Sequence, residues 1–289
     1  MFSGTLVALV TPFKNGRVDY AAIERLVDWH IAEGTDGLVP VGTTGESPTV
    51  DVEEHEKIIA TVVKRAAGRI PVIAGAGGNA TAEAIELTKF SRDAGATATL
   101  QVAPYYNKPT QEGLYRHFAA IAEAVDLPMV LYNIPGRCVV NMTPETIARL
   151  AKVPQVVAVK EATGSMDQTS EIIARCDLTI LSGDDSLTLP LMALGARGVI
   201  SVVANVVPKD VKRLTSAMLA GDVAGAQAAH RKLFPLCRAM FVETSPIPVK
   251  TAMKWAGLIE SDEKRLPLTD LSAAGAEVLR RAMKEYGLP

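Results

Sequence analysis

The sequence predicts an α/β fold, a (β/α)8 barrel followed by a C-terminal helical extension. Short apolar runs alternate with longer segments of helical periodicity, and the alternation occurs eight times within roughly the first 220 residues. Strict alternation of this kind requires parallel strands joined by right-handed crossovers. An open nucleotide-binding sheet would normally carry a GxGxxG turn after its first strand, whereas TPFKNG follows the first run here. The glycine-rich stretch 75–81 also lacks that spacing, so a closed barrel is favoured.

The expected strands are short, apolar, and bounded by Gly, Pro or polar residues, as is typical of strands covered on both faces. In chain order they are 5–10, 37–42, 71–76, 98–103, 128–133, 156–161, 179–184 and 198–203.

Helices are expected between these strands. In 21–34 the apolar residues recur at intervals of three and four. The segment 51–68 begins with a capping box made by Asp51 and Glu54, and it ends in basic residues that match the helix dipole. In 143–152 a threonine precedes a proline, which is typical of a helix N-terminus.

The last part of the chain reads as helices only. The segments 224–241, 246–258 and 271–287 have helical spacing, and no strand-like run separates them. We therefore expect a barrel domain over 1–223 and a helical domain over 224–289.

Charge and cysteine content favour small molecules and copies of the chain as partners. Lys and Arg number 30, Asp and Glu 32, and no basic block suited to nucleic acid or a membrane surface is present. The three cysteines, Cys138, Cys176 and Cys237, form no CxxC pair, which favours a reducing compartment. The apolar N-terminal stretch breaks at Pro12, too early for a signal peptide or a membrane span. We expect a cytoplasmic protein.

Polar side chains gather at the carboxyl ends of the expected strands, where barrels of this type carry their chemistry. Together with Gly183, the residues at these strand ends are Thr43, Thr44, Glu46, Asn79, Tyr105, Tyr106, Asn107, Tyr132, Asn133, Arg137, Lys160, Glu161, Asp184, Asp185, Ser201 and Asn205.

Lys160 is the candidate catalytic residue, because it ends the apolar run VVAVK. It could be a structural cation paired with Glu161, a phosphate ligand, or a nucleophile. Adjacent strand residues face opposite ways, so Glu161 should point away from it. A phosphate site would prefer glycine-rich loops after the last two strands, whereas SGDDS at 182–186 places two aspartates there. The nucleophile is favoured.

The expected surroundings of Lys160 suit an amine that attacks a carbonyl. A free lysine, with a pKa near ~10.4, is protonated at pH 7, and full burial lowers that pKa by up to about 3–5 units. Val157, Ala158 and Val159 are expected to form apolar walls around the amine. Schiff-base formation with a keto substrate is the favoured chemistry. The four histidines show no metal-ligand spacing, so neither a metal nor a separate cofactor is expected.

A proton relay and a carboxylate-binding group are also predicted. Tyr132 and Thr43 would hold hydroxyls near the lysine, and Tyr106 would extend the chain. The guanidinium fork of Arg137 matches a carboxylate bidentately. Taken alone, each of these residues is better explained by an ordinary role. Tyr105 and Tyr106 would be rim aromatics at a subunit contact, Thr43 and Thr44 would form a turn, and Arg137 would be a surface arginine in a turn.

Seven motifs carry a family resemblance. They are GTTGE (42–46), APYYNKP (103–109), YNIPGR (132–137), VKEATG (159–164), LSGDD (181–185), GVISV (198–202) and PIPVK (246–250). Together they resemble the dihydrodipicolinate synthase family of class I pyruvate-dependent aldolases, over nearly the whole chain. GTTGE or YNIP alone would indicate only the wider superfamily. The paired threonines, the YYNKP tyrosines and the arginine closing YNIPGR favour the narrower family.

The resemblance implies an enzyme that condenses pyruvate with L-aspartate 4-semialdehyde to give 4-hydroxy-tetrahydrodipicolinate, on the diaminopimelate route to lysine. Lys160 would form the Schiff base with pyruvate. Tyr132, Thr43 and Tyr106 would form the relay, and a neighbouring subunit of a homotetramer, built as a dimer of dimers, would supply Tyr106. Arg137 would hold the semialdehyde carboxylate and Thr44 the pyruvate-derived one, while backbone contacts beside the lysine would come from Gly183 and Ile200.

Many family members are inhibited by L-lysine at the dimer interface. Val52 and Pro48 depart from the sensitive pattern, so we expect weak inhibition rather than strong. Alternatively, the histidine among the matching positions is only a surface residue of its helix. The matching positions are Ser47, His55, Asn79, Glu83 and Tyr105.

Two other functions remain open. One is a related aldolase or lyase acting on N-acetylneuraminate or a 2-keto-3-deoxy-sugar acid. Arg137 argues against it, because a polyol-binding site gains little from a carboxylate clamp. The other is a non-catalytic barrel that binds a keto acid. The intact set of Lys160 and its relay residues argues against it, because binding alone needs no relay.

Overall fold

The computed structural model describes residues 2–289 and has the predicted barrel. The barrel strands are β1 (Gly4–Ala8), β4 (Gly37–Val39), β5 (Ile73–Gly75), β6 (Ala98–Val102), β7 (Met129–Asn133), β8 (Val156–Glu161), β9 (Thr179–Ser182) and β10 (Gly198–Ser201).

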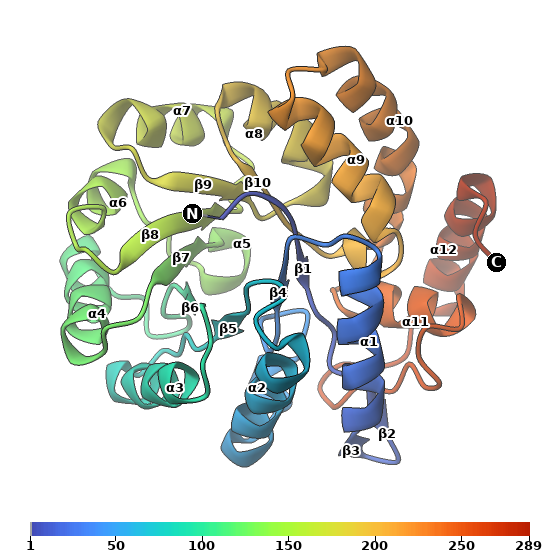
Figure 1. Cartoon of the computed structure of the whole chain (residues 1–289), viewed down its shortest axis with the longest axis horizontal. Coiled ribbons are helices and arrows are strands. Elements are labelled where there is room, and N and C mark those ends of the chain that lie inside the picture. The colour runs from blue at the N-terminus through green and yellow to red at the C-terminus, as the bar shows by residue number, and fades with distance from the viewer. Residues whose placement is uncertain (1) are drawn as a thin grey trace.

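These strands form one closed parallel sheet. Their order is β4-β1-β10-β9-β8-β7-β6-β5. A parallel bridge between Leu38 and Val72 joins the two ends of that order and closes the barrel. Helices surround the strands (Figure 1). The fold prediction is confirmed. β8 has the predicted bounds, whereas the other strands are shorter than predicted because their ends turn into the loops at the barrel rims.

The helices alternate with the strands and then continue alone to the C-terminus. The main helices are α1 (Tyr20–Ala32), α2 (Val52–Ala66), α3 (Thr81–Asp93), α4 (Gln111–Ala124), α5 (Pro135–Cys138), α6 (Pro144–Leu150), α7 (Met166–Arg175), α8 (Thr188–Leu194), α9 (Pro208–Leu219), α10 (Val223–Ala239), α11 (Ile247–Trp255) and α12 (Ala273–Tyr286), with 3-10 turns η1 (Ser47–Thr49), η2 (Asp185–Leu187) and η3 (Val203–Asn205).

Capping side chains fix where the predicted helices begin. Asp51 accepts a hydrogen bond of 2.8 Å from the backbone N–H of Glu54, at the start of α2. Thr143 caps α6 by accepting from the N–H of Thr146. Each cap satisfies a donor that the first helical turn leaves free, so both predicted helix starts are confirmed.

A short hairpin before α1 is absent from the sequence-based prediction. β2 (Phe13–Lys14) pairs antiparallel with β3 (Arg17–Val18). The turn between them is Asn15-Gly16, and both residues have positive φ, 54° and 76°. An Asn-Gly pair is the preferred sequence for this two-residue turn, so the signal was present in the sequence.

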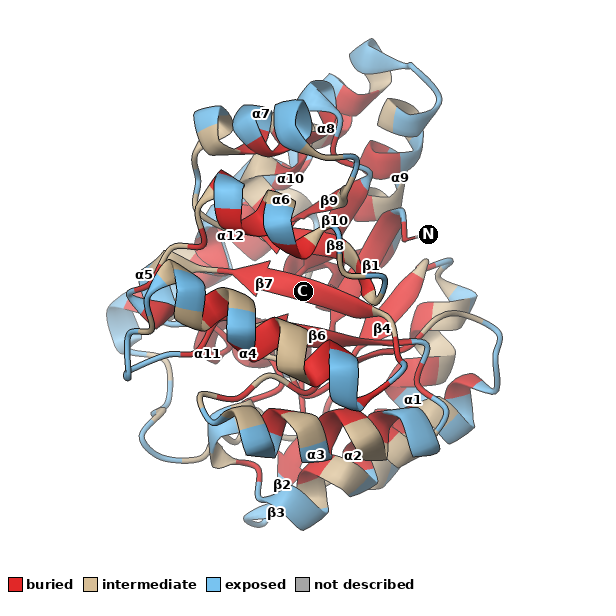
Figure 2. Ribbon diagram, turned by 90° about the vertical axis from the view of Figure 1, so that its left-hand side faces the viewer, coloured by how far each residue is buried: buried red, intermediate tan, exposed pale blue. Residues whose placement is uncertain are grey.

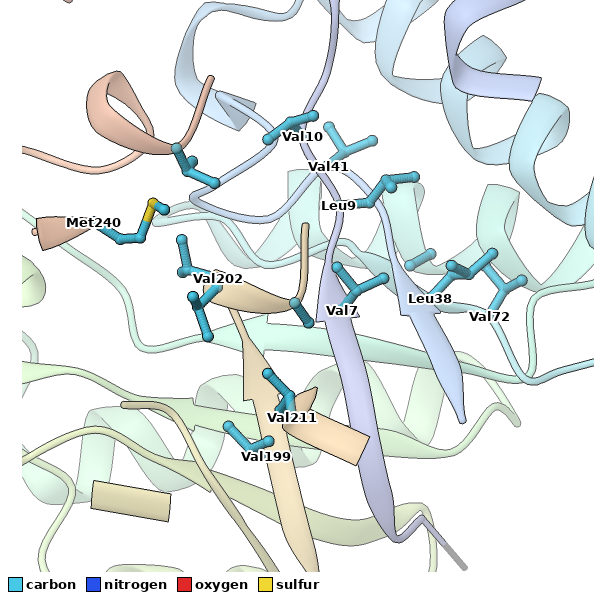
Figure 3. Close-up of a cluster of buried hydrophobic side chains, with 14 of the residues drawn as sticks. Val7, Leu9, Val10, Leu38, Val41, Val72, Val199, Val202, Val211 and Met240 are labelled. Atoms are coloured by element: carbon cyan, nitrogen blue, oxygen red, sulfur yellow. The ribbon is translucent and has the colours of Figure 1, made fainter. Parts of the chain in front are cut away.

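Two apolar cores hold the barrel together. One fills its interior with side chains from all eight strands, among them Leu6, Val39 and Leu181. The other lies between the strands and the helices, where Val7 and Val199 of neighbouring strands lie near Val211 of α9 (Figure 3). The strands are therefore buried on both faces, while the helices expose their outer faces (Figure 2).

The C-terminal helices lie on one side of the barrel (Figure 1). α10 packs against α9 and α12, and α11 contacts η3 at the barrel mouth. None of the helices in residues 2–289 is both long and apolar enough to cross a membrane.

Candidate active site

Lys160 lies near the carboxyl end of β8 with its side chain toward the barrel interior. Ala158, on the same face of the strand, packs into the inner core with Tyr132 and Leu181. Val159 packs instead into the outer core, against the helices. The expectation that Val159 walls the amine was therefore wrong, because alternate strand residues face opposite sides. Ala158 and the partly buried Val157 pack with the inner core, so the apolar surroundings of the lysine come from these two residues and from neighbouring strands.

Glu161 faces away from Lys160, as predicted. Its carboxylate accepts hydrogen bonds from the Thr163 N–H at 2.8 Å and from the Asn133 side chain at 3.4 Å. Burial raises the pKa of Glu161, and these donors offset part of that effect. The carboxylate is thus held by its own partners on the outer side of the strand and leaves the lysine unneutralised.

Burial lowers the pKa of Lys160 to about 7. The Asp185 carboxylate acts in the opposite direction, and the Arg137 guanidinium adds to the lowering. Asp185 accepts from Ser201 Oγ at 2.5 Å and from the N–H groups of Val202 and Val203 at 2.9 and 3.0 Å. Those donors already stabilise the negative charge of Asp185. Asp185 therefore raises the pKa of Lys160 by less than burial lowers it. A substantial fraction of the amine is neutral at pH 7.

Tyr132 is the register partner of Lys160 on the neighbouring strand β7. The Lys160 Nζ atom lies 4.0 Å from the centre of the Tyr132 ring. Burial raises the pKa of Tyr132 to about 12, and Arg137 and a side-chain contact with Thr43 offset part of the rise. The phenol therefore keeps its proton at neutral pH, which suits a group that passes a proton along a chain of hydroxyls.

A cavity of about 230 Å³ opens at this rim of the barrel. Thr43 reaches it from the loop after β4, Tyr132 from β7, and Arg137 from α5. Two of the three predicted hydroxyls, those of Thr43 and Tyr132, thus meet the predicted carboxylate clamp in one cavity. Lys160 does not line this cavity, but its amine lies 4.0 Å from the centre of the Tyr132 ring, which does. The other lining residues are Val41, Gly42, Ser47, Pro48, Gly75, Gly77, Leu100, Val102, Tyr105, Ile134 and Cys138.

Arg137 lies in the short helix α5. One of its Nη atoms donates to the Ser245 carbonyl at 3.2 Å. A guanidinium has five N–H donors, so this bond orients Arg137 and leaves donors for an anion in the cavity.

The remaining predicted site residues differ in how close they come to the amine. An added Cβ at Gly183 would lie only 3.2 Å from Lys160 Cε, so Gly183 is adjacent to the lysine. Thr44 and Ile200 are buried but do not line the cavity. Tyr106 is 90% exposed and lies outside the cavity wall of its own chain.

Two of the five predicted lysine-binding positions, Ser47 and Tyr105, line the cavity, and Glu83 acts on the Tyr105 side chain from nearby. Asn79 donates from Nδ2 to the Tyr105 carbonyl at 3.2 Å, and His55 Nε2 lies 2.6 Å from the Gly75 carbonyl. Burial raises the pKa of Tyr105, and the Glu83 carboxylate raises it further. Burial lowers the pKa of His55, and the Gly75 carbonyl and the Glu83 carboxylate offset part of that effect. His55 is buried, so the alternative that it is a surface residue was wrong.

Sequence reasoning assigned no role to Lys250 or Ser245, which both support the site. The Lys250 amine pairs with Glu46 at 2.6 Å, and both side chains are buried. Glu46 belongs to the motif GTTGE and Lys250 to the motif PIPVK. No local sequence pattern predicts that Lys250 pairs with Glu46, because the two residues are 204 positions apart.

Comparison with known proteins places the whole chain in one group. Residues 1–286 match the family described as the dihydrodipicolinate synthetase family. The chain is 53% identical over 290 residues to the 4-hydroxy-tetrahydrodipicolinate synthase of Syntrophobacter fumaroxidans, covering 100% of both chains. The structure of dihydrodipicolinate synthase from Aquifex aeolicus matches with a TM-score of 0.98 at 53% identity, covering 100% of this chain and 99% of that one. The chloride-inhibited enzyme from Acinetobacter baumannii, solved with pyruvate, matches with a TM-score of 0.97 at 47% identity, covering 100% of both.

Proposed function

The chain belongs to the dihydrodipicolinate synthetase family and has 4-hydroxy-tetrahydrodipicolinate synthase activity in lysine biosynthesis, and from this premise we propose that Lys160 forms a Schiff base with pyruvate. The observation that carries the proposal is the position of Lys160: buried at the barrel mouth, with a pKa of about 7, beside the Tyr132 ring. The synthase activity was predicted over the sugar-acid lyase and the non-catalytic barrel, and that prediction is confirmed.

The reaction begins when the neutral Lys160 amine attacks the keto carbon of pyruvate. Loss of water gives the protonated imine, and loss of a methyl proton from it gives an enamine. The enamine carbon then attacks the aldehyde of L-aspartate 4-semialdehyde. The amino group of that substrate closes the ring and releases Lys160. The pyruvate bound in the Acinetobacter baumannii relative supports this choice of first substrate.

Proton transfer in these steps falls to Tyr132 and Thr43. The Tyr132 hydroxyl contacts Thr43 and keeps its proton at neutral pH. We assign Tyr106 of a neighbouring subunit as the third member of the relay. Its 90% exposure in the single chain is what a residue donated across a subunit contact would show. We also propose that the protein is a homotetramer, built as a dimer of dimers, and that it acts in the cytoplasm.

Arg137 is proposed to bind the carboxylate of the semialdehyde. It lines the cavity, and its bond to the Ser245 carbonyl fixes its direction. Thr44, Gly183 and Ile200 are proposed to contact the pyruvate-derived part beside Lys160. Gly183 fits this role best, because the absence of a Cβ leaves room at the lysine side chain.

Trapping the Schiff base tests the proposal directly. Pyruvate and borohydride are added to the protein, and the reduced adduct is located by intact mass and peptide mapping. Lys250 is an internal control, because its buried amine also has a lowered pKa, about 8, but is engaged by Glu46. We expect the adduct on Lys160 and none on Lys250. An adduct elsewhere, or none at all, would show that Lys160 is not the nucleophile.

L-lysine is proposed to bind weakly at the cavity's outer edge. Glu83 supplies a carboxylate for an amino group, next to His55 and Tyr105. Asn79 and Ser47 complete this set of five positions. Glu83→Gln should abolish inhibition by L-lysine while leaving kcat unchanged. Inhibition that persists in this variant would place the lysine elsewhere.

The boundary between the barrel and the helical part is proposed at 223/224. α9 ends at Leu219 and α10 begins at Val223, after which no barrel strand follows.

A further inference from the structure

A buried ion pair ties α11 to the loop after β4. The Nζ atom of Lys250 lies 2.6 Å from Glu46 Oε1, and the side chains are 0% and 1% exposed. Lys250 also donates to the Thr11 carbonyl at 2.9 Å. The other oxygen of Glu46 accepts from the Arg265 N–H at 3.1 Å. Both carboxylate oxygens are therefore occupied by groups that lie far from Glu46 in sequence.

The loop that ends at Glu46 has a strained backbone. Val41 and Glu46, at its two ends, have φ of 51° and 57°, a region that residues other than glycine seldom adopt. Such conformations persist only where the surroundings fix them. At the first end, an added Cβ at Gly75 would lie 2.2 Å from the Val41 carbonyl oxygen, so the loop is packed directly on β5. At the second end, the fixing contacts are those of Glu46.

Thr43 and Thr44 lie between these two fixed ends. Thr43 lines the cavity and contacts the Tyr132 side chain. Thr11 Oγ1 donates to the Gly45 carbonyl at 2.7 Å, and the Thr11 carbonyl is the second acceptor of Lys250. Lys250 thus holds the loop through Glu46 directly and through Thr11 indirectly.

We propose that Lys250 and Glu46 are positioning residues, which hold the Thr43 hydroxyl in line with Tyr132 although neither touches substrate. The inference rests on the proposed relay role of Thr43. It makes the C-terminal helical segment a functional part of the active site. A merely stabilising role explains the pair less well, because a buried ion pair often adds no more stability than apolar residues of similar volume.

The first test replaces both charges together, because losing one would leave the other buried and unpaired. Glu46→Met with Lys250→Met should keep the fold but lower kcat about 100-fold, since a displaced group can cost that much without touching substrate. Borohydride trapping of pyruvate on Lys160 should continue, because the amine is unaltered. Lys254→Met is the matched control. It lies on the same helix and breaks an exposed ion pair of 2.8 Å with Asp262, so kcat should not change.

A double-mutant cycle separates positioning from general damage. Thr43→Val removes the hydroxyl that the ion pair is proposed to position. In that background, Glu46→Met with Lys250→Met should lower kcat little further, because interacting residues are not additive. Fully additive losses would overturn the positioning role. If Thr43→Val alone leaves kcat unchanged, the relay role of Thr43 fails and the positioning proposal fails with it.

Glu46→Gln provides a second route if the double replacement does not fold. Glutamine keeps the volume and an oxygen that can accept from Lys250, but it loses the charge-assisted bond. We expect a smaller loss of kcat than in the double replacement, with the same non-additivity toward Thr43→Val. Unchanged kcat in Glu46→Gln, or additive losses, would overturn the proposal.

Discussion

The Lys160 amine lies 4.0 Å from the centre of the Tyr132 ring, on the adjacent strand and in direct register. The ring face attracts a cation. Burial acts against the cation more strongly and brings the pKa of Lys160 to about 7. The two residues therefore place an amine that is partly neutral next to a phenol that holds its proton. Schiff-base chemistry needs both.

Imine formation should depend on pH through Lys160. The neutral amine is the nucleophile, so the rate of imine formation should rise as pH passes through about 7 and level off above it. Quenched single-turnover trapping with pyruvate and borohydride between about pH 5.5 and pH 9 measures this rate. A rate that keeps rising steeply beyond pH 9 would show that the amine has the pKa of an ordinary lysine.

Lys160 should also cost the protein stability. Its folded pKa of about 7 is below the ordinary lysine value of 10.5, so between these pH values the unfolded chain binds more protons. The cost is fully present below pH 7 and disappears as pH rises toward 10.5. The difference of about 3.5 between the folded and unfolded pKa values corresponds to at most ~5 kcal/mol. Lys160→Met should therefore raise the melting temperature more at pH 6 than at pH 9.

The control for this stability test is Lys254→Met. Lys254 is largely exposed, and its hydrogen bond to Asp262 raises its pKa. Lys254→Met should therefore not raise the melting temperature more at pH 6 than at pH 9. A gain for Lys160→Met that does not change with pH would argue for better packing rather than relief of a buried charge.

The sequence predicted the barrel and much of the site because both have local signatures. Residues 156–159 form a continuous apolar run, and Lys160 stands out directly after it because a buried strand has no ordinary place for an ammonium group. The side on which each neighbour packs was harder to foresee: Ala158 faces the inner core and Val159 the outer one.

The supporting contacts could not be predicted, because they join distant parts of the chain. Glu46 meets Lys250 across 204 positions, and Arg137 meets the Ser245 carbonyl across 108. The Ser245 bond uses a backbone oxygen, which every residue has, so no residue type marks it. Only the folded chain brings these groups together.

Removing the Tyr132 hydroxyl should separate proton transfer from imine formation. Tyr132→Phe keeps the ring beside Lys160 but loses the hydroxyl that contacts Thr43. We expect kcat to fall about 100-fold or more, as is typical for a lost proton-transfer group. The borohydride adduct with pyruvate should still form. If kcat is unchanged, another group carries the proton.

Adding one methyl group at Gly183 should disturb the lysine. The new Cβ would lie 2.7 Å from Ala162 Cβ and 3.2 Å from Lys160 Cε, and both distances are shorter than normal contacts. Gly183→Ala should therefore slow formation of the trapped pyruvate adduct. The control is Gly136→Ala, since nothing lies within 4 Å of a Cβ added there. Equal trapping rates in the two variants would mean that Lys160 moves freely aside.

Subunit complementation should reveal whether Tyr106 acts across an interface. Lys160→Ala and Tyr106→Phe each disable the sites of a uniform oligomer if both residues are needed. In a mixed oligomer, a subunit carrying Tyr106→Phe retains Lys160 and receives an intact Tyr106 from a Lys160→Ala neighbour. Co-expression with two affinity tags isolates this hybrid, and its kcat should recover well above that of either parent. If Tyr106 served its own chain, every site of the hybrid would lack either the lysine or the tyrosine hydroxyl, and no recovery would occur.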